Sequence, residues 1–343
     1  MVLLILLLTV GLAGCGETSG ETTKVVLTTG FEEGEIFRIE DISCYLPEMM
    51  VYLTNMQDQY ENVYGEQIWS VAVGDASLED NVKDNALARM AQVKTMNLMA
   101  RDMGIELSEK EHELVDEATE LYYTSLSYRE VEAMGADREL IRHLYGEYLL
   151  AQKVYEEIIK DINPEVSDDE ARTIKVQHIL IKTYALDGTG NRIDYTENAK
   201  RTAFHIANEA LDRARADEDF DELIRTYSEA ETSTISFRKG ELDPAFEEAS
   251  FQLGTGEISD LVETEFGYEI IKCLSTFDME ETDSNKIAIV EEKREQVFEE
   301  QYDSYVQGLT RILNEKLWDQ VEFIRDENVT TESFFSVIDE LGR

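Results

Sequence analysis

The chain has 343 residues, 43% of them hydrophobic, which is enough for two or three domains with buried cores. It carries 74 acidic and 31 basic residues, for a formal net charge of -43. This balance argues against binding to nucleic acid, because a phosphate backbone requires clustered Lys and Arg. The charge is typical of a surface that keeps a protein soluble and unassociated, and it favours basic or neutral partners.

The chain begins with a short apolar run, residues 1–14, which ends in Leu-Ala-Gly before Cys15. An apolar segment followed by small residues predicts a secretory signal peptide. The run is too short to span a bilayer, which takes about 20 apolar residues. The Leu-Ala-Gly-Cys sequence resembles the bacterial lipobox. That resemblance implies that Cys15 carries a lipid, which anchors the protein to the extracytoplasmic face of the cell membrane. Residues 15–30 then form a polar tether.

Residues 31–166 predict an all-helical domain. After a lead-in from Phe31, apolar residues recur at steps of three and four in four stretches, and capping residues mark where the helices start. The Met and Tyr residues of these stripes predict a core, although such side chains also adapt to varied apolar partners. The four helices are expected to begin near Leu46, Ser77, Ser108 and Asp137.

Residues 167–278 read as a mixed α+β domain. Period-2 alternation predicts two strands that pair with each other, at 173–182 and 262–272. Between them the sequence predicts a glycine-containing loop, a short strand and three helices. The loop is expected at 184–194, the strand at 233–237, and the helices begin near Thr196, Asp219 and Pro244.

Residues 279–343 begin with a very acidic stretch that is expected to be a solvated hinge. A long helix with an apolar stripe from Phe298 to Ile312 follows. The segment is too short to form a large core of its own. We therefore expect it to pack on the N-terminal helices.

Four motifs of the middle domain occur in an order that resembles the parvulin (rotamase) family of peptidyl-prolyl cis-trans isomerases. They are His178-Ile-Leu, the segment Phe246–Phe251, the segment Leu253–Ser259, and Gly-Tyr-x-Ile-Ile starting at Gly267. The resemblance implies an antiparallel sheet with flanking helices, inserted in a helical domain that binds unfolded chains. It also implies that the partners are unfolded secreted proteins with X-Pro bonds.

The resemblance assigns site residues one by one. His178 matches the family's first-strand histidine, Leu242 and Phe246 match the proline pocket, and Thr264 matches a threonine near the second histidine. Taken singly, Leu242 and Phe246 are more typical of an ordinary core, and His178 of a buried hydrogen bond. Taken together in the family's order, they indicate the proline pocket. Two positions depart from the family, because Glu269 replaces the second histidine and Thr234 falls where an Asp or Cys is usual. These departures predict weak isomerase activity or none.

The sequence predicts neither a metal site nor a cofactor. Cys44 and Cys273 are expected to be buried free thiols, and pairing in an oxidising compartment is the alternative. The leading interpretation is a membrane-anchored foldase that isomerises X-Pro bonds. The alternative is a holdase chaperone whose parvulin domain has lost its chemistry.

Overall fold

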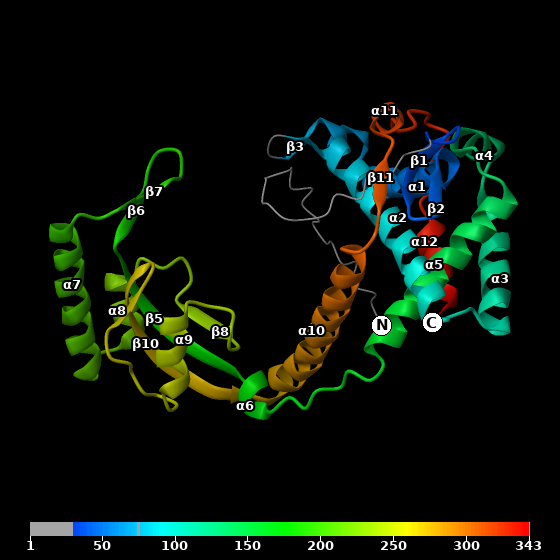
Figure 1. Ribbon diagram of the computed structural model, residues 1–343. Helices are drawn as coiled ribbons and strands as arrows, with labels where there is room; N and C mark the ends of the chain where they lie inside the picture. Colours follow the sequence, from blue (N-terminus) through cyan, green and yellow to red (C-terminus); the bar gives the residue numbers. More distant parts are fainter. Residues whose placement is uncertain (1–29, 74–75, 343) are drawn as a thin grey trace, which may run out of the picture. The chain divides into compact units, whose positions relative to one another are not determined.

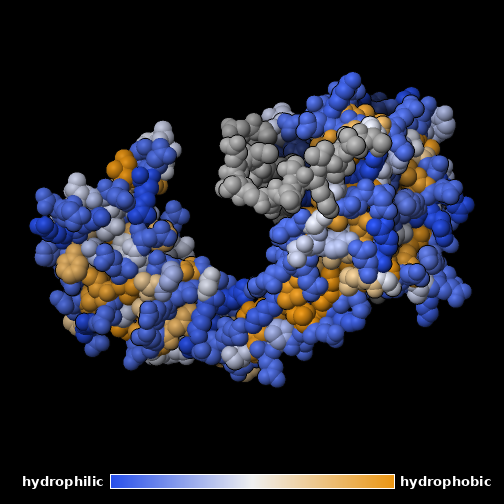
Figure 2. Space-filling model, in the orientation of Figure 1, coloured by the Kyte–Doolittle hydropathy of each residue, from blue (hydrophilic) through white to orange (hydrophobic). Residues whose placement is uncertain are grey.

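The computed structural model describes residues 30–73 and 76–342 (Figure 1). The expected signal peptide and Cys15 lie outside these residues. The chain divides into two compact units. Unit 1 combines the residues up to Lys160 with those from Val297 onward, and unit 2 is Asp161–Gln296. Within the described ranges, none of the helices combines the length and the apolar character needed to cross a membrane. Hydrophilic residues cover much of the visible face (Figure 2), as the charge of -43 leads one to expect.

The helices of unit 1 begin where the capping signals predict. Ser77 and Ser108 each accept a hydrogen bond from a backbone N–H of the first helical turn, in complete capping boxes. A helix that we did not predict starts after Ser127, whose capping box with Glu130 is the signal that was available. The helices before the middle domain are α1 (Leu46–Tyr64), α2 (Leu78–Met103), α3 (Glu109–Ser125), α4 (Tyr128–Met134) and α5 (Arg138–Ile159).

The prediction that this part of the chain is all-helical is wrong. A three-stranded antiparallel sheet of order β11-β1-β2 joins β1 (Glu35–Ile39), β2 (Ile42–Tyr45) and β11 (Arg311–Leu313). Strand β1 is buried along nearly its whole length, so it lacks the alternation that would have revealed it. Smaller elements complete unit 1: η1 (Glu66–Ser70), β3 (Ala72–Val73), β4 (Ala76–Ser77), α11 (Glu315–Trp318) and α12 (Phe334–Leu341).

Aromatic side chains from both ends of the chain form the core of unit 1. The rings of Tyr145 and Phe334 stack with their centroids 4.5 Å apart, and the Tyr145 hydroxyl donates to the Phe334 carbonyl. Tyr52 and Tyr122 contact the same phenylalanine edge-on or tilted. Because α12 supplies a ring to the centre of this core, the C-terminal segment is an integral part of unit 1.

Unit 2 is built on a four-stranded antiparallel sheet of order β8-β5-β10-β9. Its helices are α6 (Asp168–Ala171), α7 (Glu197–Arg215), α8 (Phe220–Tyr227) and α9 (Pro244–Gln252). Its strands are β5 (Thr173–Lys182), β8 (Thr234–Phe237), β9 (Val262–Thr264) and β10 (Gly267–Asp278). The mixed helix and antiparallel sheet confirm the predicted α+β class, and the pairing of β10 with β5 confirms the central prediction.

Three local predictions fail in this region. The expected single strand at 262–272 is divided by a turn into β9 and β10. The expected loop at 184–194 is a hairpin of β6 (Tyr184–Leu186) and β7 (Arg192–Asp194), whose tip is held by hydrogen bonds to the Asp187 carboxylate. The expected acidic hinge is the first turn of α10 (Met279–Val306), which ends before Ile312. Glu280 and Glu281 suit that position because carboxylates are favourable at a helix N-terminus.

Candidate active site

The two faces of the unit 2 sheet have different coverings. Ile179, Ile181 and Ile270 lie on the face that packs against α7 and α8. Val176 and Ile271 lie on the opposite face, with Phe237 and Phe246. Side chains alternate along a strand, and directly paired residues share a face. His178 is paired with Ile271, so its ring lies on the face covered by α9.

His178 and Glu269 form a buried pair across β5 and β10. Glu269 is paired with Leu180, so it is the diagonal neighbour of His178 on the same face. The His178 Nδ1 lies 2.8 Å from Glu269 Oε2, and its Nε2 lies 2.9 Å from the Thr232 carbonyl oxygen. The two side chains are nearly inaccessible, with His178 8% and Glu269 3% exposed. This confirms the prediction that the two residues meet on neighbouring central strands.

The hydrogen bonds determine where the protons of this pair reside. A carbonyl oxygen only accepts, so the Nε2 of His178 must carry a proton and donate it to Thr232. Between Nδ1 and Glu269 there is then one shared proton, which lies on the imidazolium or on the carboxylic acid. Burial by itself lowers the pKa of His178, but the hydrogen bond and the charge of Glu269 outweigh it and raise that pKa. Burial raises the pKa of Glu269, and His178 offsets only part of this increase.

Phe246 and Leu242 are the two apolar residues that the resemblance assigns to the site. The Phe246 ring meets the His178 ring edge-on, with centroids 5.4 Å apart, and is itself buried. Leu242 precedes α9 and is 39% exposed. Phe246 thus lies against His178, and Leu242 lies on the loop that leads into the same helix, α9. The structure thus places an apolar surface beside the polar pair.

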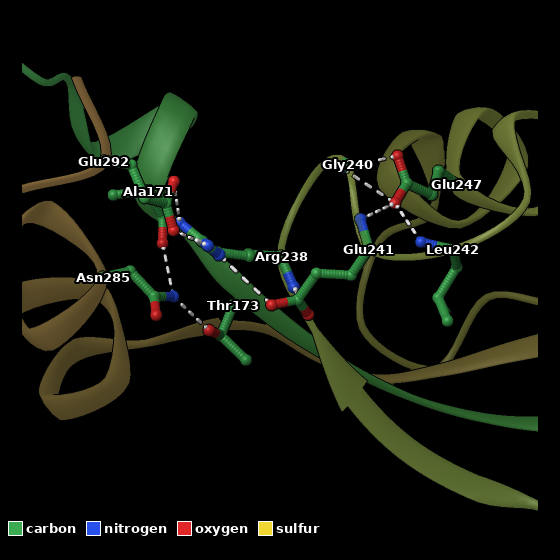
Figure 3. Close-up of polar contacts among 9 residues, drawn as sticks. All are labelled: Ala171, Thr173, Arg238, Gly240, Glu241, Leu242, Glu247, Asn285 and Glu292. Atoms are coloured by element: carbon green, nitrogen blue, oxygen red, sulfur yellow. Dashed lines mark hydrogen bonds and ion pairs between the residues drawn. The ribbon is translucent and has the colours of Figure 1, made fainter. Parts of the chain in front are cut away.

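Glu247 fixes the loop that carries Leu242. Its Oε1 accepts hydrogen bonds from the backbone N–H groups of Gly240, Glu241 and Leu242, at 2.8 to 2.9 Å (Figure 3). Its Oε2 accepts a further bond from Gly240. Three consecutive N–H groups around one carboxylate form a rigid turn. Sequence reasoning missed this role of Glu247, and no pattern of spacing would have predicted it.

Glu241 of the same loop lines a polar cavity of about 550 Å³. Arg238 lines it, and Glu241 and Glu292 both pair with the Arg238 guanidinium (Figure 3). Asn285 donates hydrogen bonds to the Ala171 carbonyl and the Thr173 hydroxyl on the other side of it. These contacts connect α10 to the sheet and, through Arg238, to Glu241 of the loop.

Of the other two assigned residues, Thr264 shares the sheet face of Glu269, because it is paired with Gly267, whereas Thr234 does not. Thr234 is paired with Gln177, whose side chain donates to Asp221 of α8, so Thr234 lies on the opposite face of the sheet. The Thr264 hydroxyl bonds to the backbone of the turn between β9 and β10, at Phe266 and Gly267. The group that reaches His178 from the segment before β8 is the carbonyl of Thr232. Backbone groups of this kind leave no signal in a sequence.

Both cysteines of the described residues, Cys44 and Cys273, are buried free thiols. They belong to different units. The expected free state is therefore confirmed, and the alternative of a disulfide between them is not realised. Burial raises the pKa of each thiol, which makes both poor nucleophiles.

Comparison with known proteins identifies the class of this domain. Residues 178–275 match the rotamase family model, described as a PPIC-type PPIase domain. The match begins at His178 and includes Leu242, Phe246 and Glu269. Unit 2 therefore contains a parvulin-type peptidyl-prolyl cis-trans isomerase domain.

Similarity extends beyond that domain. The chain is 27% identical over 277 residues to the foldase protein PrsA of Caldanaerobacter subterraneus subsp. tengcongensis, covering 74% of this chain and 78% of that protein. It is 23% identical over 283 residues to PrsA of Clostridium botulinum strain Kyoto, covering 76% and 79%. A crystal structure of PrsA from Bacillus cereus matches with a TM-score of 0.39 and 19% identity, covering 80% of this chain and 98% of the other. The chain therefore contains a parvulin-type isomerase domain and is similar to the PrsA foldases over about three quarters of its length.

Proposed function

We propose that this protein is an extracytoplasmic foldase that binds unfolded secreted chains and rotates their X-Pro bonds at the surface formed by His178, Leu242 and Phe246. The observation that carries the proposal is the contact between a buried His-Glu pair and an apolar wall, in a domain of the rotamase family. The similarity to PrsA over about three quarters of the chain supports the foldase role.

The reaction needs no covalent step. The barrier to rotation about a peptide bond is about 18 to 20 kcal/mol, because resonance gives the C–N bond double-bond character. For an X-Pro bond the cis form lies within about 1 kcal/mol of the trans form. A site therefore accelerates the exchange when it binds the twisted state better than either planar state. An apolar wall that removes water from the amide favours loss of resonance.

In this scheme each residue has a distinct task. Leu242 and Phe246 hold the proline ring, and the loop fixed by Glu247 keeps Leu242 in place. His178 and Glu269 hold a proton inside the sheet next to that wall. A His-carboxylate pair then takes the place of the family's paired histidines.

The test is an isomerisation assay on a short X-Pro peptide with the full chain. Leu242→Ala removes an exposed apolar side chain, so it should lower kcat/KM by about tenfold while leaving the fold intact. The matched control is Leu186→Ala, at an exposed leucine of the β6–β7 hairpin, which should change nothing. Equal loss in both variants, or in neither, contradicts the assignment of the proline pocket.

The holdase alternative predicts a different pattern. A chaperone that only binds unfolded chains shows no isomerase activity above background, yet suppresses aggregation of an unfolded protein. Under our proposal, Leu242→Ala loses isomerase activity and keeps aggregation suppression, provided that unit 1 supplies the client-binding surface. If wild type isomerises no peptide, the holdase function replaces the enzymatic one.

We further propose that a lipid on Cys15 anchors the protein to the extracytoplasmic face of the membrane. The Leu-Ala-Gly-Cys sequence after an apolar run supports this. Cys15→Ser should release the protein into the medium or leave an unprocessed precursor, as fractionation and mass spectrometry would reveal. An unlipidated intact N-terminus on wild-type protein refutes the anchor.

A further inference from the structure

Three potential metal ligands lie together in unit 1, outside the isomerase domain. Glu48 is in the first turn of α1. His143 and Glu147 lie four residues apart on α5, so they share one face of that helix. One ligand atom from each of the three residues lies within 4.8 Å of the others. The sequence alone does not reveal this cluster, because Glu48 is far from the other two residues along the chain.

Two of the three ligand separations are close to those of a tetrahedral zinc site. The His143 Nε2 lies 3.3 Å from Glu147 Oε1 and 3.8 Å from Glu48 Oε1. Zinc binds nitrogen and oxygen ligands at about 2.0 to 2.2 Å, which places two tetrahedral ligands about 3.3 to 3.6 Å apart. The separation of His143 from Glu147 falls in this range, and its separation from Glu48 exceeds the range by about 0.2 Å.

The charges of the cluster also favour a cation. Lys94, with only 1% of its side chain exposed, lies 2.6 Å from Glu48 Oε1 and 2.8 Å from Glu147 Oε2. Lys94 also lies 2.9 Å from Glu147 Oε1, so it contacts both carboxylates through the oxygens that face His143. With His143 neutral, as a metal ligand must be, two carboxylates and one ammonium group carry a net charge of -1. A carboxylate also has more acceptor positions than Lys94 uses, so these oxygens retain lone pairs for a metal.

Neighbouring groups already orient the ligands. The other oxygen of Glu48 accepts a hydrogen bond from the Tyr45 N–H at 2.6 Å. Lys94 holds both carboxylates from the buried side. Contacts of this kind around metal ligands fix their rotamers and raise affinity.

The site is open to solvent on one side. A cavity of about 280 Å³ is lined by Glu48 and His143, together with Ser43, Tyr45, Pro47 and Leu140. The His143 side chain is 56% exposed. A metal site needs an entry path, and this cavity supplies one.

We propose that Glu48, His143 and Glu147 bind a divalent transition metal, and that Zn²⁺ is the ion their chemistry fits best. An imidazole with two carboxylates suits zinc, whereas Ca²⁺ and Mg²⁺ prefer shells made of oxygen. The bound ion links α1 to α5 and so stabilises the helical unit.

Calorimetric titration of the chelator-treated full chain with ZnCl₂ tests the proposal. Wild type should bind one equivalent in a saturable step, and His143→Ala should weaken that step about tenfold or more. The matched control is His112→Ala on α3, another exposed histidine, which should leave the affinity unchanged. An excess of MgCl₂ should not displace the zinc.

Two outcomes overturn the proposal. If His143→Ala binds zinc as wild type does, the metal is held elsewhere. If Mg²⁺ displaces the zinc, the binding reflects only the diffuse negative charge of the surface. Since the His143 side chain is largely exposed, its removal should not unfold the protein, and an unchanged circular dichroism spectrum checks this.

Discussion

Replacing Glu269 by Gln tests the central pair of the isomerase site. The substitution keeps the size of the side chain and removes its charge. The imidazolium form of His178 then has no carboxylate to stabilise it. Neutral His178 still donates from Nε2 to Thr232, and its Nδ1 accepts from the new amide. The pKa of His178 should therefore fall, because the carboxylate that raises it is gone.

The cost in stability follows from the type of hydrogen bond. Bonds to charged groups contribute about 1.5 to 3 kcal/mol, and neutral ones about 0.5 to 1.5 kcal/mol. Glu269→Gln should therefore destabilise the sheet by about 1 to 2 kcal/mol near neutral pH. Amide hydrogen exchange is the suitable assay, because a two-unit chain need not unfold in a single step. Protected amides of β5 and β10 should exchange about tenfold faster, since 1.4 kcal/mol corresponds to a factor of ten.

The pH dependence has a definite sign. The folded protein raises the pKa of Glu269 above 4.5 and that of His178 above 6.5. The folded state therefore binds more protons than the unfolded state. The free energy of unfolding falls as pH rises from the pKa values of the unfolded chain through the raised pKa values of the folded protein. Above the raised pKa of His178 the pair loses its shared proton, and Glu269 remains as a buried carboxylate. The variant should show a smaller decline over the same range.

NMR titration of the histidine ring protons measures the pKa shift directly. The other three histidines of the chain serve as internal references. If the His178 resonances titrate at the same pH in wild type and in Glu269→Gln, the carboxylate does not hold the proton. An unchanged exchange rate in β5 and β10 would contradict the estimated stability difference.

Two further substitutions test how the fold supports the site. Glu247→Ala removes the acceptor of the Gly240–Leu242 amides and should lower kcat/KM about tenfold, because Leu242 is then misplaced. Glu248→Ala, at an exposed residue of the same helix, is the control and should leave kcat/KM unchanged. Equal kinetics in wild type and both variants would refute the role of Glu247. Gly267→Ala places a Cβ 2.1 Å from the Ile181 carbonyl oxygen at a φ of +144, so unit 2 should lose more than about 2 kcal/mol of stability. Gly188→Ala meets nothing within 4 Å and is the control, and comparable melting of both variants would contradict the argument.

Elements with strong local signals were predictable from the sequence. The helices after Ser77, Ser108 and Asp137 begin at capping residues, and each cap is hydrogen-bonded in the structure. Strand β5 was predicted with its correct ends because polar and apolar residues alternate along it. Local physics determines these elements, so a single sequence is sufficient to find them.

Elements that depend on distant partners were missed. Strand β1 has no alternation because both of its faces are covered, and it pairs with β11, about 270 residues away in the chain. The acidic residues after Asp278 look like a solvated hinge by composition, yet they form the first turn of α10. In each case a tertiary contact or a helix end overrides the local secondary-structure preference of the residues.

The candidate site was predictable as far as side chains define it. The family resemblance placed His178, Glu269 and Phe246, and these are the residues that the fold brings together. It also suggested Thr234, which the strand register puts on the other face of the sheet. An alignment with a gap near β8 cannot determine register, and a shift of one residue exchanges the two faces.

What completes the site is a backbone carbonyl at Thr232 and a carboxylate, Glu247, that binds three backbone amides. Both depend on loop conformation, which the residue types alone do not predict. The same reasoning applies to unit 1, where Glu48 meets His143 and Glu147 only because α1 and α5 lie close together. Sequence spacing reveals ligands on one helix, as with the i, i+4 pair on α5, and a site that needs a second helix becomes visible only in the fold.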